Sequence, residues 1–116
     1  GIDDAILRAS KYIEAGVDAI MIHSKEQDFT EIQDFCLKYS KFNKKVPLIA
    51  VPSSYDKTYE DDLNKAGVNV VIYANQLLRS SYPAMVKTAE SILTNKRAFE
   101  SRPDMLSIKE IINLIK

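Results

Sequence analysis

Glycine, cysteine and histidine are scarce in this chain of 116 residues. Its three glycines, Gly1, Gly16 and Gly67, lie too far apart for a dinucleotide-binding fingerprint, a Walker A loop or a nucleophile elbow, which need glycines at close spacing. The single histidine, His23, and the single cysteine, Cys36, are too few for a zinc finger, an internal disulfide or a Cys-x-x-Cys redox pair. These kinds of site are therefore excluded within the chain.

An excess of charge of one sign and a long apolar run are also missing. The 16 lysines and arginines balance the 16 aspartates and glutamates, so the chain lacks the basic surplus that nucleic-acid binding by counterion release requires. Its apolar runs are much shorter than the about 20 residues of a membrane-spanning helix, and no signal-peptide pattern opens the chain. We therefore expect a soluble, cytoplasmic protein that binds neither nucleic acids nor membranes.

Three short apolar runs do occur, and they alternate with segments of helical periodicity. The runs predict strands at residues 17–22, 46–51 and 68–73, and because they are nearly continuous, we expect both faces of each strand to be buried. Apolar residues at helical spacing predict the remaining elements. These helices are expected at residues 3–15, 28–39, 58–66, 77–93 and 107–115.

Capping boxes and a repeated turn mark the ends of several predicted helices. Two acidic residues stand three positions after a helix-capping residue, which is the pattern of a capping box. The pairs are Asp28 with Glu31 and Ser107 with Glu110. The sequences AGVD at 15–18 and AGVN at 66–69 predict the same helix-to-strand turn, used twice at an interval of 51 residues, with its glycine in the left-handed conformation.

The alternation of strands and helices predicts an α/β fold with three parallel strands, because parallel neighbours need crossover connections. Three strands leave both edges of the sheet open, so we expect the chain to be part of a larger sheet or barrel. The last helix carries an isoleucine stripe that needs a covering surface, either on this chain or on another subunit. The stripe consists of Ile108, Ile111, Ile112 and Ile115.

Polar residues follow each predicted strand, and ligands of α/β folds bind at the carboxyl ends of the strands. His23 and Lys25 follow the first strand, Ser53 and Ser54 the second, and Asn75 the third. His23 can donate a hydrogen bond or move a proton near neutral pH, and the serines can bind phosphoryl or carboxylate oxygens. The residues alone equally fit structural roles in the turns. Cys36 lies on an apolar stripe, where a buried inert thiol is expected.

Three segments resemble one enzyme family. Residues 15–25, AGVDAIMIHSK, resemble the sixth-strand segment of the phosphoenolpyruvate mutases, within the isocitrate lyase and phosphoenolpyruvate mutase superfamily. Residues 51–58, VPSSYDKT, are similar to that family's Val-Pro-Thr-Lys-Tyr-Tyr-Lys-Thr. Residues 72–79, IYANQLLR, are similar to its Ile-Trp-Ala-Asn-His-x-Leu-Arg. Order and spacing agree over nearly the whole chain. The departures, Ser53-Ser54 for Thr-Lys and Gln76 for His, leave the superfamily member open.

The resemblance implies the carboxyl-terminal part of a (β/α)8 TIM-type barrel, covering its last three strands. Residues 1–96 would form βα units, 97–106 a linker and 107–116 a terminal helix, which this superfamily exchanges between neighbouring barrels. His23 matches a substrate-contacting histidine, and Ser53 is expected to bind substrate beside it. Magnesium is the implied cofactor, but its ligands, the catalytic aspartate and the gating loop would all lie upstream of Gly1. No metal ligand is expected within the chain.

The implied activity is the magnesium-dependent isomerisation of phosphoenolpyruvate and phosphonopyruvate, which forms a phosphorus–carbon bond in phosphonate biosynthesis. A superfamily relative that hydrolyses phosphonopyruvate or cleaves a carbon–carbon bond is the alternative among enzymes. A non-catalytic α/β module that associates through its sheet edges and isoleucine stripe is the alternative outside them. A barrel that lacks its metal ligands cannot hold magnesium, so residues 1–116 alone are expected to be inactive. The terminal helix predicts a homo-oligomer.

Overall fold

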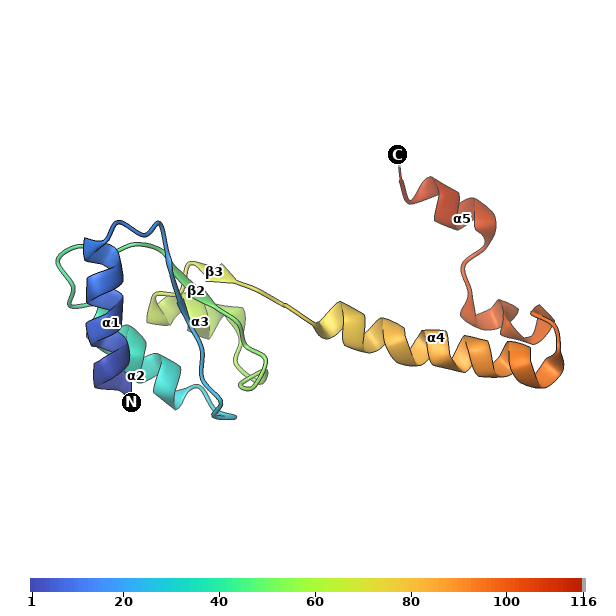
Figure 1. The fold of residues 1–116 in the computed structure, drawn as a ribbon, viewed down its shortest axis with the longest axis horizontal. Coiled ribbons are helices and arrows are strands. Elements are labelled where there is room, and N and C mark those ends of the chain that lie inside the picture. Colours follow the sequence, from blue (N-terminus) through green and yellow to red (C-terminus); the bar gives the residue numbers. More distant parts are fainter. Residues whose placement is uncertain (116) are drawn as a thin grey trace. The chain divides into compact units, whose positions relative to one another are not determined.

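The computed structural model describes residues 1–115, which form two compact units (Figure 1). The first unit is Gly1–Ala74, and the second begins at Asn75. Helices and strands alternate through the first unit, as the sequence predicts. They are α1 (Ile2–Glu14), β1 (Ile20–Ile22), α2 (Thr30–Tyr39), β2 (Leu48–Ala50), α3 (Glu60–Ala66) and β3 (Val70–Val71).

The three strands form one parallel sheet in the order β1-β2-β3, which confirms the predicted α/β class. Ile22 pairs with Ala50, and Ala50 in turn pairs with Val71. The hydrogen-bonded strands are shorter than the apolar runs that predicted them, since each begins two or three residues into its run. Because all three strands run the same way, the segments that follow them emerge at one edge of the sheet.

All three helices of the first unit pack on one face of this sheet. The strand residues that point to this face join helical side chains in a single core. From the strands come Ile20, Ile22, Leu48 and Ala50, and from the helices Ala9, Ile13, Ile32, Phe35, Cys36, Tyr39 and Leu63. This packing removes one face of β1 and of β2 from water, whereas β3 contributes only the partly buried Val71.

The opposite face of the sheet is open, so the prediction of strands buried on both faces is wrong for this chain. Met21 is 58% exposed although it lies between the buried Ile20 and Ile22, and Val70 of β3 is 44% exposed beside the partly buried Val71. Alternate residues of a strand point to opposite faces, and the first unit supplies helices to one face alone. The apolar runs therefore reflect a second covering layer that residues 1–115 do not provide.

The predicted turn occurs twice with the same hydrogen bonds. After α1, the Gly16 N–H donates to the Ile13 carbonyl at 3.1 Å, and the next N–H donates to the Tyr12 carbonyl at 3.3 Å. After α3, the corresponding bonds from Gly67 and Val68 are 2.9 and 3.0 Å long. Both glycines have positive φ, +92° and +106°, as a Schellman motif requires.

The second unit contains α4 (Gln76–Asn95), the 3-10 helix η1 (Phe99–Asp104) and α5 (Ile108–Asn113). The helix η1 lies within the segment predicted as a linker, where its Asp104 forms an ion pair with Lys87 of α4 at 2.8 Å. The capping box of Ser107 and Glu110 is confirmed, with both of its hydrogen bonds present. Neither α4 nor α5 has a buried side chain. No helix within residues 1–115 is long and apolar enough to cross a membrane.

Candidate functional site at the carboxyl end of the sheet

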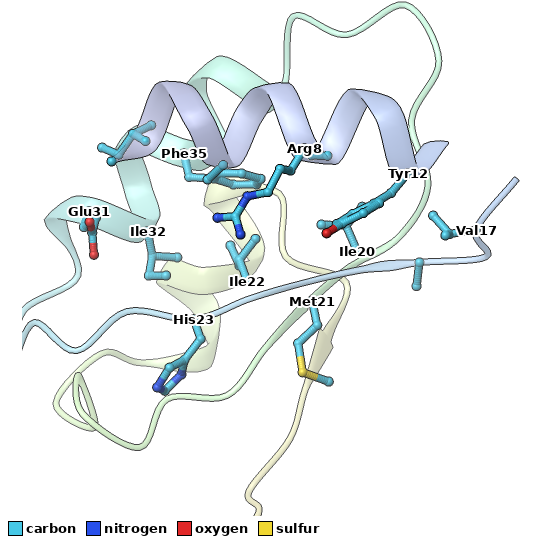
Figure 2. A pocket seen from close by; sticks show the side chains of 15 residues that line it. Arg8, Tyr12, Val17, Ile20, Met21, Ile22, His23, Glu31, Ile32 and Phe35 are labelled. Carbon is cyan, nitrogen blue, oxygen red and sulfur yellow. The ribbon is translucent and has the colours of Figure 1, made fainter. Parts of the chain in front are cut away.

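His23 directly follows β1 and lies on the open face of the sheet. In Figure 2 the side chains of Met21 and His23 point to one side of the strand, whereas Ile20 and Ile22 point to the other, towards the helices. The His23 side chain is exposed. Strand geometry therefore presents the imidazole at the ligand-binding edge of the sheet and keeps it out of the helix-covered core.

A groove of about 340 Å³ runs beside β1 and includes His23 in its wall (Figure 2). Arg8 of α1 and Glu31 of α2 also line it, with apolar residues such as Tyr12 and Met21 between them. The Arg8 guanidinium is paired with Asp4 at 3.1 Å, and both side chains are solvated. The groove thus brings a basic, an acidic and a titratable side chain to the free edge of β1.

Ser53 follows β2, the strand next to β1, so the fold brings its segment to the same sheet edge as His23. Ser53 is half-buried, and its N–H donates to the Val51 carbonyl at 2.8 Å in a tight turn. Two residues on, Tyr55 is fully buried, with its ring 6.3 Å from that of Phe29. This aromatic contact joins the loop after β2 to the loop after β1.

The other candidates have different surroundings. Lys25 is exposed, and Ser54 is half-buried beside Ser53. Asn75 belongs to the second unit, where it is the N-cap of α4. Cys36 is 2% exposed within the core, and this burial raises the pKa of its thiol from 9.0 to about 11. At neutral pH the thiol is therefore protonated and inert, as the sequence predicts.

The predicted capping box at the start of α2 is wrong. The Asp28 carboxylate accepts the Thr30 N–H at 2.9 Å, and this bond lowers the pKa of Asp28 below its ordinary value. Glu31, however, does not return to Asp28 but accepts a hydrogen bond from the hydroxyl of Ser24. The partner is seven residues away in the sequence, beyond the reach of a spacing rule that looks three residues ahead.

The titratable side chains of the chain do not form a metal-binding cluster in the part that the structure describes. Among residues 1–115, no three His, Cys, Asp or Glu side chains gather where they could hold a metal ion. Arg8 and Glu31, which line the groove beside His23, were not singled out as site residues from the sequence. Their helical spacing from Asp4 and Asp28 indicates surface pairing and capping, so only the fold reveals that they share a wall with His23.

The chain matches one protein family and several characterised relatives. A family model described as phosphoenolpyruvate phosphomutase matches residues 1–93. A phosphoenolpyruvate phosphomutase of Tetrahymena pyriformis is 34% identical over 114 residues, covering 98% of this chain and 37% of that protein. A phosphonopyruvate hydrolase of Variovorax sp. (strain Pal2) is 35% identical over 115 residues, covering 98% and 39%.

Solved structures agree with these relatives. The crystal structure of a phosphoenolpyruvate phosphomutase from Streptomyces platensis subsp. rosaceus superposes with a TM-score of 0.87 at 29% identity, covering 97% of this chain and 38% of that one. A phosphonopyruvate hydrolase in complex with oxalate and Mg²⁺ gives 0.84 at 35% identity, covering 98% and 40%. The chain therefore spans about two fifths of the length of the relatives it matches, and it has the fold of part of their TIM barrel.

Proposed function

Since the chain belongs to the phosphoenolpyruvate phosphomutase family, we propose that it is the carboxyl-terminal part of a barrel enzyme that interconverts phosphoenolpyruvate and phosphonopyruvate. In this isomerisation the bond from phosphorus to the enol oxygen breaks, and a bond from phosphorus to the methylene carbon forms. No other reactant is consumed. The enzyme would thereby supply the phosphorus–carbon bond of phosphonates.

The position of His23 is the observation that carries this proposal. It lies at the carboxyl end of a parallel strand, on the face of the sheet away from the helices, where barrel enzymes bind their substrates. An imidazole N–H there can donate a hydrogen bond to a phosphoryl or carboxylate oxygen of the substrate. We propose that Ser53, at the end of the neighbouring strand, donates a second hydrogen bond from its hydroxyl.

Magnesium is the cofactor that the relatives suggest, since one of their structures contains it. The side chains of residues 1–115 do not offer a set of ligands for it. We therefore assign no metal-binding role to this chain and propose that its contribution is confined to substrate contacts. The ligands would come from the part of the enzyme that the relatives possess outside the matched two fifths.

The proposal is tested by giving phosphonopyruvate to the full-length protein and following phosphorus by ³¹P NMR. Conversion to phosphoenolpyruvate without release of inorganic phosphate is the expected result. Release of phosphate would instead identify a hydrolase, which the 35% identical Variovorax relative makes the second candidate. In that reaction the phosphorus–carbon bond breaks, while water supplies an oxygen to phosphate and a proton to pyruvate. Absence of any turnover would overturn both.

The role of His23 is tested by substitution in the same protein. We expect His23→Ala to lower kcat/KM by about 10- to 1000-fold, or about 1.4 to 4 kcal/mol, because a charge-assisted contact in a water-poor site is lost. His23→Gln is the matched variant, since its amide still donates a hydrogen bond but cannot move a proton. Retained activity in His23→Gln would assign binding alone, and unchanged kinetics in His23→Ala would return His23 to a structural role.

We also propose that the isoleucine stripe, with three members in α5 and Ile115 just beyond it, packs on a neighbouring subunit and makes the protein a homo-oligomer. All four isoleucines are more than half exposed, and α5 has no buried residue. A helix of six residues is not stable by itself in water and depends on packing. A surface on another copy of the protein would provide that packing.

A further inference from the structure

Ser24, the residue that follows His23, anchors the loop between β1 and α2 through hydrogen bonds. Ser24 is 3% exposed, although its neighbours His23 and Lys25 are exposed. Its hydroxyl donates to the carboxylate of Glu31 and accepts the N–H of Glu26 at 3.0 Å. The hydroxyl therefore uses its donor and an acceptor position, as a buried polar group must.

Glu31 makes this bond from the first turn of α2. In a capping box, a glutamate accepts the backbone N–H of the residue that caps its own helix. Here the Asp28 side chain accepts the Thr30 N–H, and Glu31 extends instead to the end of β1. The first turn of α2 is thus tied to the strand end by a side-chain bond to a charged acceptor, which is stronger than a neutral one.

The bond has a geometric consequence for His23. Consecutive residues of an extended segment point to opposite sides, so a Ser24 held on the helix side leaves His23 on the open side. Glu31 also lines the groove that contains His23, but it lies on the helix side of β1, whereas the imidazole and Met21 lie on the opposite side (Figure 2). Without the bond, the loop of residues 23–29 would retain the Asp28 cap but lose its attachment to the strand end.

We propose that the Ser24–Glu31 pair positions the imidazole of His23 for the substrate. Glu31 acts through Ser24 and is a positioning residue, whereas His23 makes the contact. The inference rests on the proposed function in so far as His23 touches the substrate. The effect of the Ser24–Glu31 pair on the position of the His23 ring can be measured separately.

The kinetic arm uses the full-length protein with phosphonopyruvate. We expect Ser24→Ala and Glu31→Ala each to lower kcat/KM by about 10-fold, which corresponds to ~1.4 kcal/mol, and their combination to cost no more than either alone. Glu31→Gln should stay within about 3-fold of the wild type, because its amide oxygen still accepts the Ser24 hydrogen bond. Asp28→Ala is the matched control: it removes a hydrogen bond from the same loop without touching Ser24, and we expect wild-type kinetics.

The second arm observes His23 itself by NMR of its imidazole ring, assigned through its loss in His23→Gln. Ser24→Ala and Glu31→Ala should shift and broaden the ring signals, whereas Glu31→Gln and Asp28→Ala should leave them as in the wild type. Unchanged ring signals in Glu31→Ala, or losses that multiply in the double variant, would overturn the inference. So would a Glu31→Gln variant as impaired as Glu31→Ala, since that result makes the charge itself the requirement.

The two arms separate this inference from the proposed function. If the wild-type protein does not turn over phosphonopyruvate, the proposed function fails, and the ring signals still decide whether Ser24 and Glu31 hold His23. Thermal unfolding of each variant provides the control for folding. Ser24→Ala and Glu31→Ala break the same hydrogen bond from opposite sides, so either one that folds is sufficient for the comparison of ring signals with Glu31→Gln.

Discussion

Cys36 is the residue whose surroundings most clearly determine its chemistry. Burial in the core raises the pKa of its thiol from 9.0 to about 11. Between these two pH values the unfolded chain releases the thiol proton while the folded chain retains it, so the free energy of unfolding falls as pH rises. The slope from this one group reaches at most about 1.4 kcal/mol per pH unit. The thiol is therefore a source of alkaline instability.

We expect urea unfolding between pH 7 and pH 10.5 to show this loss in the wild type, and Cys36→Val to lack the part due to the thiol. The difference between the two proteins, plotted against pH, isolates Cys36 from the lysines and tyrosines that titrate in the same range. Parallel pH profiles for the two proteins would show that the thiol is not buried in solution.

At the scale of single elements, the turns at Gly16 and Gly67 are the features best specified locally. A Cβ added to Gly67 would meet no atom within 4 Å, so the cost of a substitution comes from its positive φ alone. We expect Gly67→Ala to lower the free energy of unfolding by about 1 to 2 kcal/mol, measured in urea. Gly67→Asn is the matched comparison and should cost less, because asparagine tolerates the left-handed conformation. Equal stability of Gly67→Ala and the wild type would contradict the left-handed conformation of Gly67 in this turn.

The elements that the sequence predicts correctly are those that depend on neighbours in the chain. Helix periodicity, the two glycine turns and the capping box of Ser107 all involve contacts within five residues, and all are present. Placing His23 and Ser53 after adjacent parallel strands also needed only the strand pattern. The resemblance to a family, by contrast, rests on whole motifs rather than on any single contact.

Features that depend on distant partners could not be predicted in this way. The burial of Met21 depends on whatever covers the open face of the sheet, which a local apolar pattern cannot locate. The hydrogen-bond partner of Glu31 depends on where β1 ends relative to α2, whereas the sequence spacing predicts a capping box with the nearer Asp28. Arg8 enters the groove for the same reason, because α1 packs beside β1.

At the scale of the whole molecule, the proposal of self-association makes a measurable prediction. The four isoleucines of the stripe each gain roughly 1.5 to 3 kcal/mol on full burial before entropy losses, which is enough to favour burial against a partner surface. We expect sedimentation at several concentrations to show an oligomer in the wild type, and Ile111→Asp combined with Ile112→Asp to dissociate it. Asn113→Asp, which adds a charge to the same helix outside the stripe, should remain assembled. A folded wild type that is strictly monomeric would refute the proposal.

The open face of the sheet also has a chemical consequence. Met21, at 58% exposure, presents its thioether to solvent beside β2. Peroxide converts an accessible methionine to the sulfoxide, replacing a flexible apolar side chain with a polar one. In a closed barrel the sulfoxide oxygen would lie among the side chains of the interior. Met21 precedes His23 by two residues and points to the same face of the sheet. A closed barrel would therefore shield the sulfur from peroxide, whereas residues 1–115 by themselves leave it accessible.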